Sequence, residues 1–87
     1  MEGHILSRRY ASVRFSTRWR NYETLEILKH CVDIRLHNRS IESVELDDLC
    51  EGFDVETIDL SFNRLEGIDL RPLKHCRNLK QLVLTCN

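Results

Sequence analysis

The sequence has little of the residues that make tight turns, with one proline and three glycines among 87 residues. This scarcity argues against a turn-rich β-sandwich and against a flexible linker. No stretch holds the roughly 18 apolar residues that a membrane helix needs, so no membrane span is predicted. The 13 basic and 14 acidic residues nearly cancel, which argues against a dedicated nucleic-acid binder. The 27 Leu, Ile, Val and Phe residues are enough for the core of one domain.

The four cysteines form no Cys-x-x-Cys pair, so the sequence does not indicate a structural zinc site. The N-terminus also lacks the apolar segment of an export signal. Free thiols without an export signal favour a reducing, cytoplasmic location. Residues 1–20 contain five arginines, one acidic residue and interspersed serines, which is also typical of an organelle transit peptide. Organelle targeting therefore remains an alternative.

A repeat of 24 residues is the strongest pattern in the sequence. Shifting the chain against itself by 24 places apolar residues over apolar residues. Four columns have three members each: Cys31, Val55 and Leu79; Ile34, Ile58 and Leu82; Leu36, Leu60 and Leu84; Leu25, Leu49 and Leu73. Within a unit the apolar residues first alternate, as in a strand with one buried face. They then recur every three residues, which suits a 3₁₀ helix or a short helical return.

The fullest unit reads Val55-x-x-Ile58-x-Leu60-x-x-Asn63-x-Leu65-x-x-Ile68-x-Leu70-x-x-Leu73. At these residues the chain resembles the leucine-rich repeat family, whose units have roughly 20–29 residues. The resemblance implies an α/β fold: a right-handed leucine-rich-repeat solenoid with a parallel β-sheet on its concave side and short helices or 3₁₀ turns on its convex side. It also implies that the Asn63 side chain bonds buried backbone groups of neighbouring coils.

The predicted organisation is a single domain over residues 1–87. Residues 31–54 and 55–78 would be two full repeats and residues 79–87 part of a third, after an N-terminal cap over residues 1–30.

Within that cap, strict alternation over residues 11–19 predicts a capping strand. The three-residue spacing of Tyr22, Leu25, Leu28 and Cys31 predicts a helix over residues 21–30. An N-terminal tail that docks elsewhere is the alternative.

The repeat pattern stops partway through a unit, at Asn87. Leu79, Leu82 and Leu84 would then line an open core end beside an unpaired strand. We expect that this edge either pairs with a second copy, giving a homodimer, or belongs to a longer array.

Stacked parallel strands would bring residues 24 apart into lateral contact, about 4.8 Å between strands. The outward residues of these strands form the predicted partner-binding surface. Its members are Arg14, Asp33, Arg35, His37, Thr57, Asp59, Ser61, Gln81, Val83 and Thr85. Within it, Arg35 and Asp59 are expected to form a lateral pair of opposite charges.

The sequence offers no support for an enzyme. It contains no Gly-rich phosphate loop and no set of Ser, His and Asp that can be placed together. Two acidic columns, Glu42 with Glu66 and Glu45 with Asp69, lack the dense oxygen ligands of a calcium loop. We predict no catalytic residues, no cofactor and no metal.

The leading functional hypothesis is therefore a non-catalytic protein–protein interaction module that self-associates or is part of a longer array. The alternative comes from charge asymmetry, since residues 1–30 carry six basic and three acidic residues. Such a basic arm could bind nucleic acid or an anionic membrane, with Phe15 and Trp19 available for base stacking. Packing of both aromatics into the cap is the competing expectation.

Overall fold

The computed structural model describes residues 10–19, 21–49 and 53–87. Cys50 lies outside the described residues, as does much of the arginine-rich segment that raised the alternative of a transit peptide.

An antiparallel sheet is built around the alternating segment near the N-terminus. Strands β1 (Tyr10–Thr17) and β2 (Tyr22–Leu28) form a hairpin, and β4 (Ile41–Glu45) pairs with the other side of β1. The strand order is β2-β1-β4. Alternation along β1 buries Ala11, Val13, Phe15 and Thr17, which places one face of this sheet against the core.

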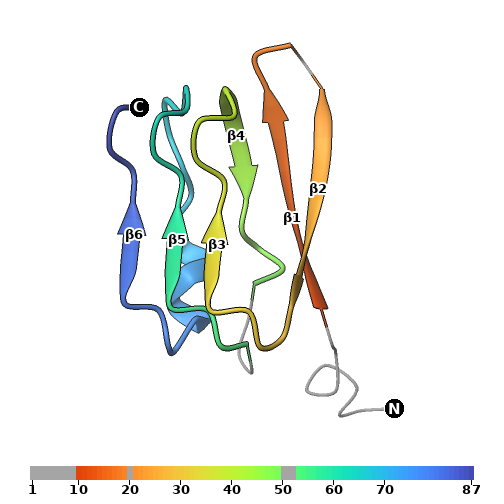
Figure 1. The fold of residues 1–87 in the computed structure, drawn as a ribbon, viewed down its shortest axis with the longest axis vertical. Helices are drawn as coiled ribbons and strands as arrows, with labels where there is room; N and C mark the ends of the chain where they lie inside the picture. Colours follow the sequence, from red (N-terminus) through yellow and green to blue (C-terminus); the bar gives the residue numbers. More distant parts are fainter. Residues whose placement is uncertain (1–9, 20, 50–52) are drawn as a thin grey trace.

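A parallel sheet is formed by three short strands, β3 (Asp33–Arg35), β5 (Thr57–Asp59) and β6 (Gln81–Val83), in that order. Ile34 is in register with Ile58, and Ile58 with Leu82, so each strand lies beside the residues 24 positions further along. Figure 1 shows the three strands side by side and pointing the same way. The lateral pairing predicted from the apolar columns is thus confirmed for these strands.

Asn63 ties neighbouring segments together at the end of β5. Its Nδ2 donates to the carbonyl oxygens of Leu36 and Leu60, at 2.9 Å each. Its Oδ1 accepts from the backbone N–H groups of Arg39 at 2.8 Å and Ile41 at 3.1 Å. The side chain is buried, so these bonds satisfy backbone groups that water does not reach. The role expected for this asparagine is confirmed.

The segment after each parallel strand has a left-handed residue at the same place in the 24-residue repeat, and the turn after β3 has a second one at Ser40. Asn38, Phe62 and Cys86 are 24 residues apart and have φ angles of 57°, 57° and 60°. The first unit has Arg39 at the position equivalent to Asn63, and Asn38, one place earlier, occupies this left-handed turn position. A left-handed conformation suits asparagine but costs free energy for phenylalanine.

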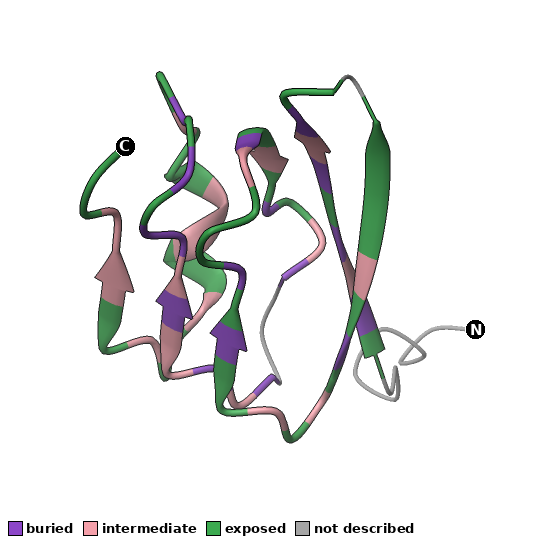
Figure 2. Cartoon of the chain, turned by 45° about the horizontal axis from the view of Figure 1, so that its top comes forward, coloured by how far each residue is buried: buried purple, intermediate pink, exposed green. Residues whose placement is uncertain are grey.

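One hydrophobic core lies between the two sheets. It joins Val13 and Phe15 of β1 with Ile34 of β3, Ile58 of β5 and the loop residue Leu46. Figure 2 shows buried positions on β1, β3 and β5, whereas β6 is half-buried or exposed. The parallel sheet is therefore anchored by its first two strands.

The predicted leucine-rich-repeat solenoid is wrong. The chain forms a compact domain in which an antiparallel and a parallel three-stranded sheet share one core. Among the described residues the only helix is the 3₁₀ helix η1 (Arg71–His75). The 24-residue pattern governs the pairing of β3, β5 and β6 and the turns that follow them, whereas β1, β2 and β4 follow other pairings. The concave and convex sides expected of such a solenoid are therefore wrong as well.

The helix predicted over residues 21–30 is also wrong, because that segment is β2. Spacing of three fits a helix, but Leu25 and Ile27 alternate with exposed Thr24 and Glu26, as a strand requires. The capping strand is present as β1, yet it pairs with β2 and β4 and not with β3. Period-two alternation identifies a strand and carries no information about its neighbours.

We expect Asn63→Ala to lower the free energy of unfolding by about 2–4 kcal/mol, because buried backbone groups lose their partners. Asn87→Ala is the matched control, since Asn87 makes similar bonds to Leu60 and Leu84 but is exposed. The Asn87→Ala variant should lose about 1 kcal/mol or less of its free energy of unfolding. Urea unfolding followed by circular dichroism measures both, and equal small losses would contradict the role given to Asn63.

Candidate partner-binding face

The outward side of the parallel sheet brings together nine of the ten residues predicted for partner binding. The strand register aligns Asp33 with Thr57 and Gln81, and Arg35 with Asp59 and Val83. His37, Ser61 and Thr85 continue this alignment as a third row. The Asn38 N–H donates to the Ser61 carbonyl at 3.0 Å, and the Phe62 N–H donates to the Thr85 carbonyl at 2.9 Å. We call these nine residues the parallel face.

Arg14 does not belong to this face. It lies on β1 in the antiparallel sheet, aligned with Thr24 and Glu45. Its guanidinium carbon is 5.2 Å from the centre of the Tyr22 ring, which is the geometry of a cation–π contact. The prediction failed here because it treated β1 as the first strand of the parallel sheet.

Asp59 is the most constrained side chain of the parallel face. Its Oδ1 accepts from the Ser61 hydroxyl at 2.6 Å and from the Ser61 backbone N–H at 3.0 Å. His37 Nδ1 lies 3.7 Å from its other carboxylate oxygen. The two bonds from Ser61 are the main reason that the pKa of Asp59 is lowered below 3.8, with smaller contributions from His37 and Arg35. The carboxylate is therefore charged and held in one orientation.

The lateral pair expected between Arg35 and Asp59 takes a different form. The two residues are aligned across the strands, but the Arg35 guanidinium lies 3.6 Å from Asp33 of its own strand. Arg35 remains largely exposed, with 73% of its side chain accessible. The cation is thus available to a partner, while Asp59 is held by Ser61.

Exposure on the parallel face falls from its edges to its centre. Asp33, Arg35, His37, Gln81 and Thr85 are exposed. The other four, on or beside the central positions, are half-buried or buried: Thr57, Asp59, Ser61 and Val83. Ser61 thus serves to orient Asp59 and offers little contact area of its own.

The edge predicted for self-association is the outer side of β6. Leu79, Leu82 and Leu84 are half-buried, and β6 pairs only with β5 among the described strands. Beside this edge lies a small apolar hollow of about 170 Å³ lined by Leu65, Gly67, Ile68 and Leu84, together with Glu66 and Asn87. The paired strand is three residues long.

Sequence reasoning missed the exposed aromatic Phe62, which lies three residues beyond the end of β5. Its side chain is 58% exposed although its backbone is left-handed. It borders an open groove of about 580 Å³ that is also lined by Asn38, Arg64 and Cys86. The available signal was that Phe62 stands outside the apolar columns, with Asn38 and Cys86 at the equivalent positions.

The four residues of the two acidic columns are exposed. Within residues 10–19, 21–49 and 53–87, no group of three His, Cys, Asp or Glu side chains gathers around a common point. Arg71 binds the Asp69 carboxylate through Nε and Nη2, each at 2.9 Å, and holds the pKa of Asp69 down to about 2. This carboxylate is committed to an arginine.

In the described part of the chain, no helix is long and apolar enough to cross a membrane. Comparisons with protein-family models, with curated proteins and with solved structures found no match to this chain.

We expect Ser61→Ala to raise the pKa of Asp59 toward 3.8, because the hydroxyl bond that favours the carboxylate is lost. Thr85→Ala is the control, since Thr85 occupies the equivalent position one strand further on. An NMR titration of the Asp59 carboxyl carbon measures both, and an unchanged pKa in Ser61→Ala would contradict the assignment.

The same bond links stability to pH. The folded-state pKa of Asp59 is lowered, so this carboxylate stabilises the fold at pH values above its unfolded-state pKa. That contribution to the free energy of unfolding is lost as the pH falls through the folded-state pKa. Ser61→Ala should therefore lose less stability on acidification than the unsubstituted chain.

Proposed function

We propose that this chain is a non-catalytic protein-interaction module that binds a partner protein through the parallel face. The observation that carries the proposal is the Asp59 carboxylate, fixed by Ser61 beside exposed Arg35 and His37 of the neighbouring segment. A charge that is already oriented loses little conformational entropy when a partner binds. Groups of both signs on one rigid sheet favour a partner with a complementary arrangement of charges.

The strands that carry this face are short, which limits the contact area. Each spans three residues, and only three strands contribute. Interfaces well below the usual size bind weakly unless several act together. The proposal therefore includes weak binding strengthened by avidity. The location that goes with it is the cytoplasm, where thiols such as Cys31, Cys76 and Cys86 stay reduced.

The test is quantitative cross-linking in a cell extract with the double variant Arg35→Ser/Asp59→Ser. The matched control is Arg71→Ser/Asp69→Ser, which removes the same two charge types from an exposed ion pair elsewhere. We expect the first variant to reduce specific partner capture by about tenfold, as loss of an interfacial charge pair does, and the control to leave it unchanged. Circular dichroism and thermal unfolding confirm that both variants fold. Equal capture by the two variants would place the binding site elsewhere.

A second candidate function is binding of single-stranded nucleic acid near the β1–β2 turn. Trp19 is 64% exposed, and the guanidinium carbon of Arg18 lies 5.5 Å from the centre of its ring. Such a pair can stack on a base. Phe15, the other aromatic expected to stack, is buried in the core and takes no part.

This second function predicts oligonucleotide binding that weakens steeply with salt and is lost in Trp19→Ala. Fluorescence anisotropy with a labelled single-stranded oligonucleotide measures it. The control is Trp19→Phe, which keeps an aromatic ring at position 19 and should still bind the oligonucleotide. No binding even at low salt would eliminate this candidate.

A further inference from the structure

The outer edge of β2 is the longest strand edge without a partner among the described strands. β2 has seven residues and pairs only with β1. The Thr17 N–H donates to the Asn21 carbonyl at 3.0 Å where the hairpin closes. Because hydrogen-bonded pairs recur every two residues in an antiparallel ladder, Glu23, Leu25 and Ile27 direct their backbone groups toward β1. The backbone groups of Tyr22, Thr24, Glu26 and Leu28 therefore face outward.

The other edge of β1 supports this assignment. The Arg18 N–H donates to the Ser40 carbonyl at 2.9 Å, and the Ser12 N–H donates to the Asp48 carboxylate at 2.7 Å. The backbone N–H and C=O groups of even-numbered β1 residues thus point away from β2, and those of odd-numbered residues point toward it. A row of outward N–H and C=O groups on β2 is the usual template for adding another strand.

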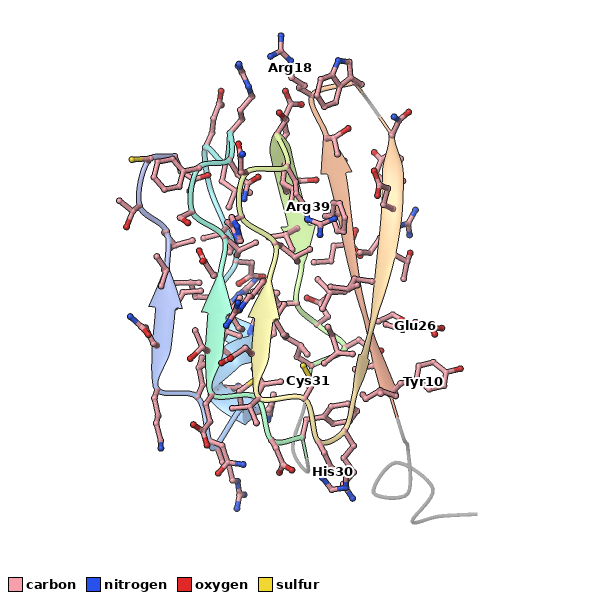
Figure 3. All side chains as sticks on the ribbon, in the orientation of Figure 1. Tyr10, Arg18, Glu26, His30, Cys31 and Arg39 are labelled. Atoms are coloured by element: carbon pink, nitrogen blue, oxygen red, sulfur yellow. The ribbon has the colours of Figure 1, made fainter. Side chains whose placement is uncertain are left out.

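Large apolar side chains flank this edge. Tyr22 is 69% exposed and Leu28 is 66% exposed, at the two ends of β2. Tyr10, paired with Leu28 across the hairpin, is 50% exposed. In Figure 3 the side chains of Tyr10 and Glu26 point outward on the side of the molecule away from the parallel sheet. This surface is separate from the parallel face.

The sequence of β2, Tyr-Glu-Thr-Leu-Glu-Ile-Leu, is complementary to itself when run antiparallel. With Leu25 opposite Leu25 of a second copy, Tyr22 lies opposite Leu28 and Thr24 opposite Glu26. Both glutamates then face uncharged residues. A register moved by two residues in one direction places Glu26 opposite Glu26, which like charges disfavour. A shift of two residues in the opposite direction places Leu28 beyond the end of the second copy's β2, so that Leu28 faces no residue of that strand.

From this complementarity we propose that two copies of the chain associate through β2, antiparallel and centred on Leu25. The product is one continuous six-stranded sheet in the order β4-β1-β2-β2-β1-β4. On its outer face Tyr10 and Leu28 of one copy form a row with Tyr22 of the other. Contact within this row buries part of these apolar side chains, which are exposed in the isolated chain.

The β2 edge differs from the one predicted for self-association at β6. The β6 strand has three residues with half-buried leucines, whereas β2 has seven residues with exposed apolar ends. A longer edge forms more backbone hydrogen bonds and buries more apolar area. The interface at β2 is independent of the parallel face, so its failure would leave the proposed function standing.

The test is sedimentation velocity of the full chain over a concentration series, with Thr24→Pro and Thr24→Val compared. Proline at position 24 removes an outward N–H without breaking a bond to β1. Thr24→Val keeps that N–H and the β-branched shape, so it is the matched control. We expect the dimer dissociation constant to rise by about tenfold or more in Thr24→Pro and to stay within about twofold in Thr24→Val.

Leu28→Glu provides a second variant that does not depend on proline being accommodated. It places a charge beside Glu26 and opposite Tyr22, at a position exposed in the single chain, and it should also raise the dissociation constant by about tenfold. Folding of each variant is checked by circular dichroism.

Amide hydrogen exchange at low and high concentration locates the interface. Concentration-dependent protection of the Thr24 and Glu26 amides supports association through β2. Protection of the Leu84 and Cys86 amides instead would place the interface at β6, and a monomer at every concentration would also overturn the proposal.

Discussion

The hydrogen bonds of the Asn63 side chain are the interaction on which the arrangement of the parallel sheet depends. One amide group joins the end of β5, the end of β3 and the turn that leads into β4. The turn backbone would otherwise be buried without partners, and hydrogen bonding inside the protein removes that penalty. Since β4 also pairs with β1, the same side chain lies at the junction between the two sheets.

This junction determines what each side of the parallel sheet can do. Alternation sends Ile34, Ile58 and Leu82 inward and leaves the intervening residues on the outside. Burial of the inward residues stabilises the sheet and so holds the outward residues in fixed rows. Asp59 becomes a positioned charge because Ser61, two residues later on the same face, bonds its carboxylate. The parallel face is thus a consequence of core packing.

The antiparallel sheet has a different surface chemistry. Its inner face belongs to the shared core, while its outer face carries Tyr10, Tyr22 and Leu28 with large exposed areas. Arg14 stacks on Tyr22 in the same sheet, so a cation and an aromatic ring share this outer face. A polar, charged face on one sheet and an apolar edge on the other suit two separate contacts with other chains.

The sequence by itself determined the parts of the structure that depend on local periodicity. Apolar columns 24 residues apart predicted the parallel register of β3, β5 and β6, and the resemblance to leucine-rich repeats implied the bonds of Asn63. The rows of Asp33 with Thr57 and of Arg35 with Asp59 followed from that register, because a shared period fixes which residues meet. The alternation of residues 11–19 likewise identified the strand β1.

Only the tertiary structure decided how the first thirty residues join this sheet. Tyr22, Leu25 and Leu28 fit a helical spacing, whereas Leu25 and Ile27 fit a strand. Pairing with β1 decided between them, and it buries Ile27 and part of Leu25. Alternation in β1 did not say whether its partner would be β3 or β4, so Arg14 was assigned to the wrong sheet. Strand direction and partner choice depend on contacts between segments far apart in the chain, and single-segment periodicity contains no such information.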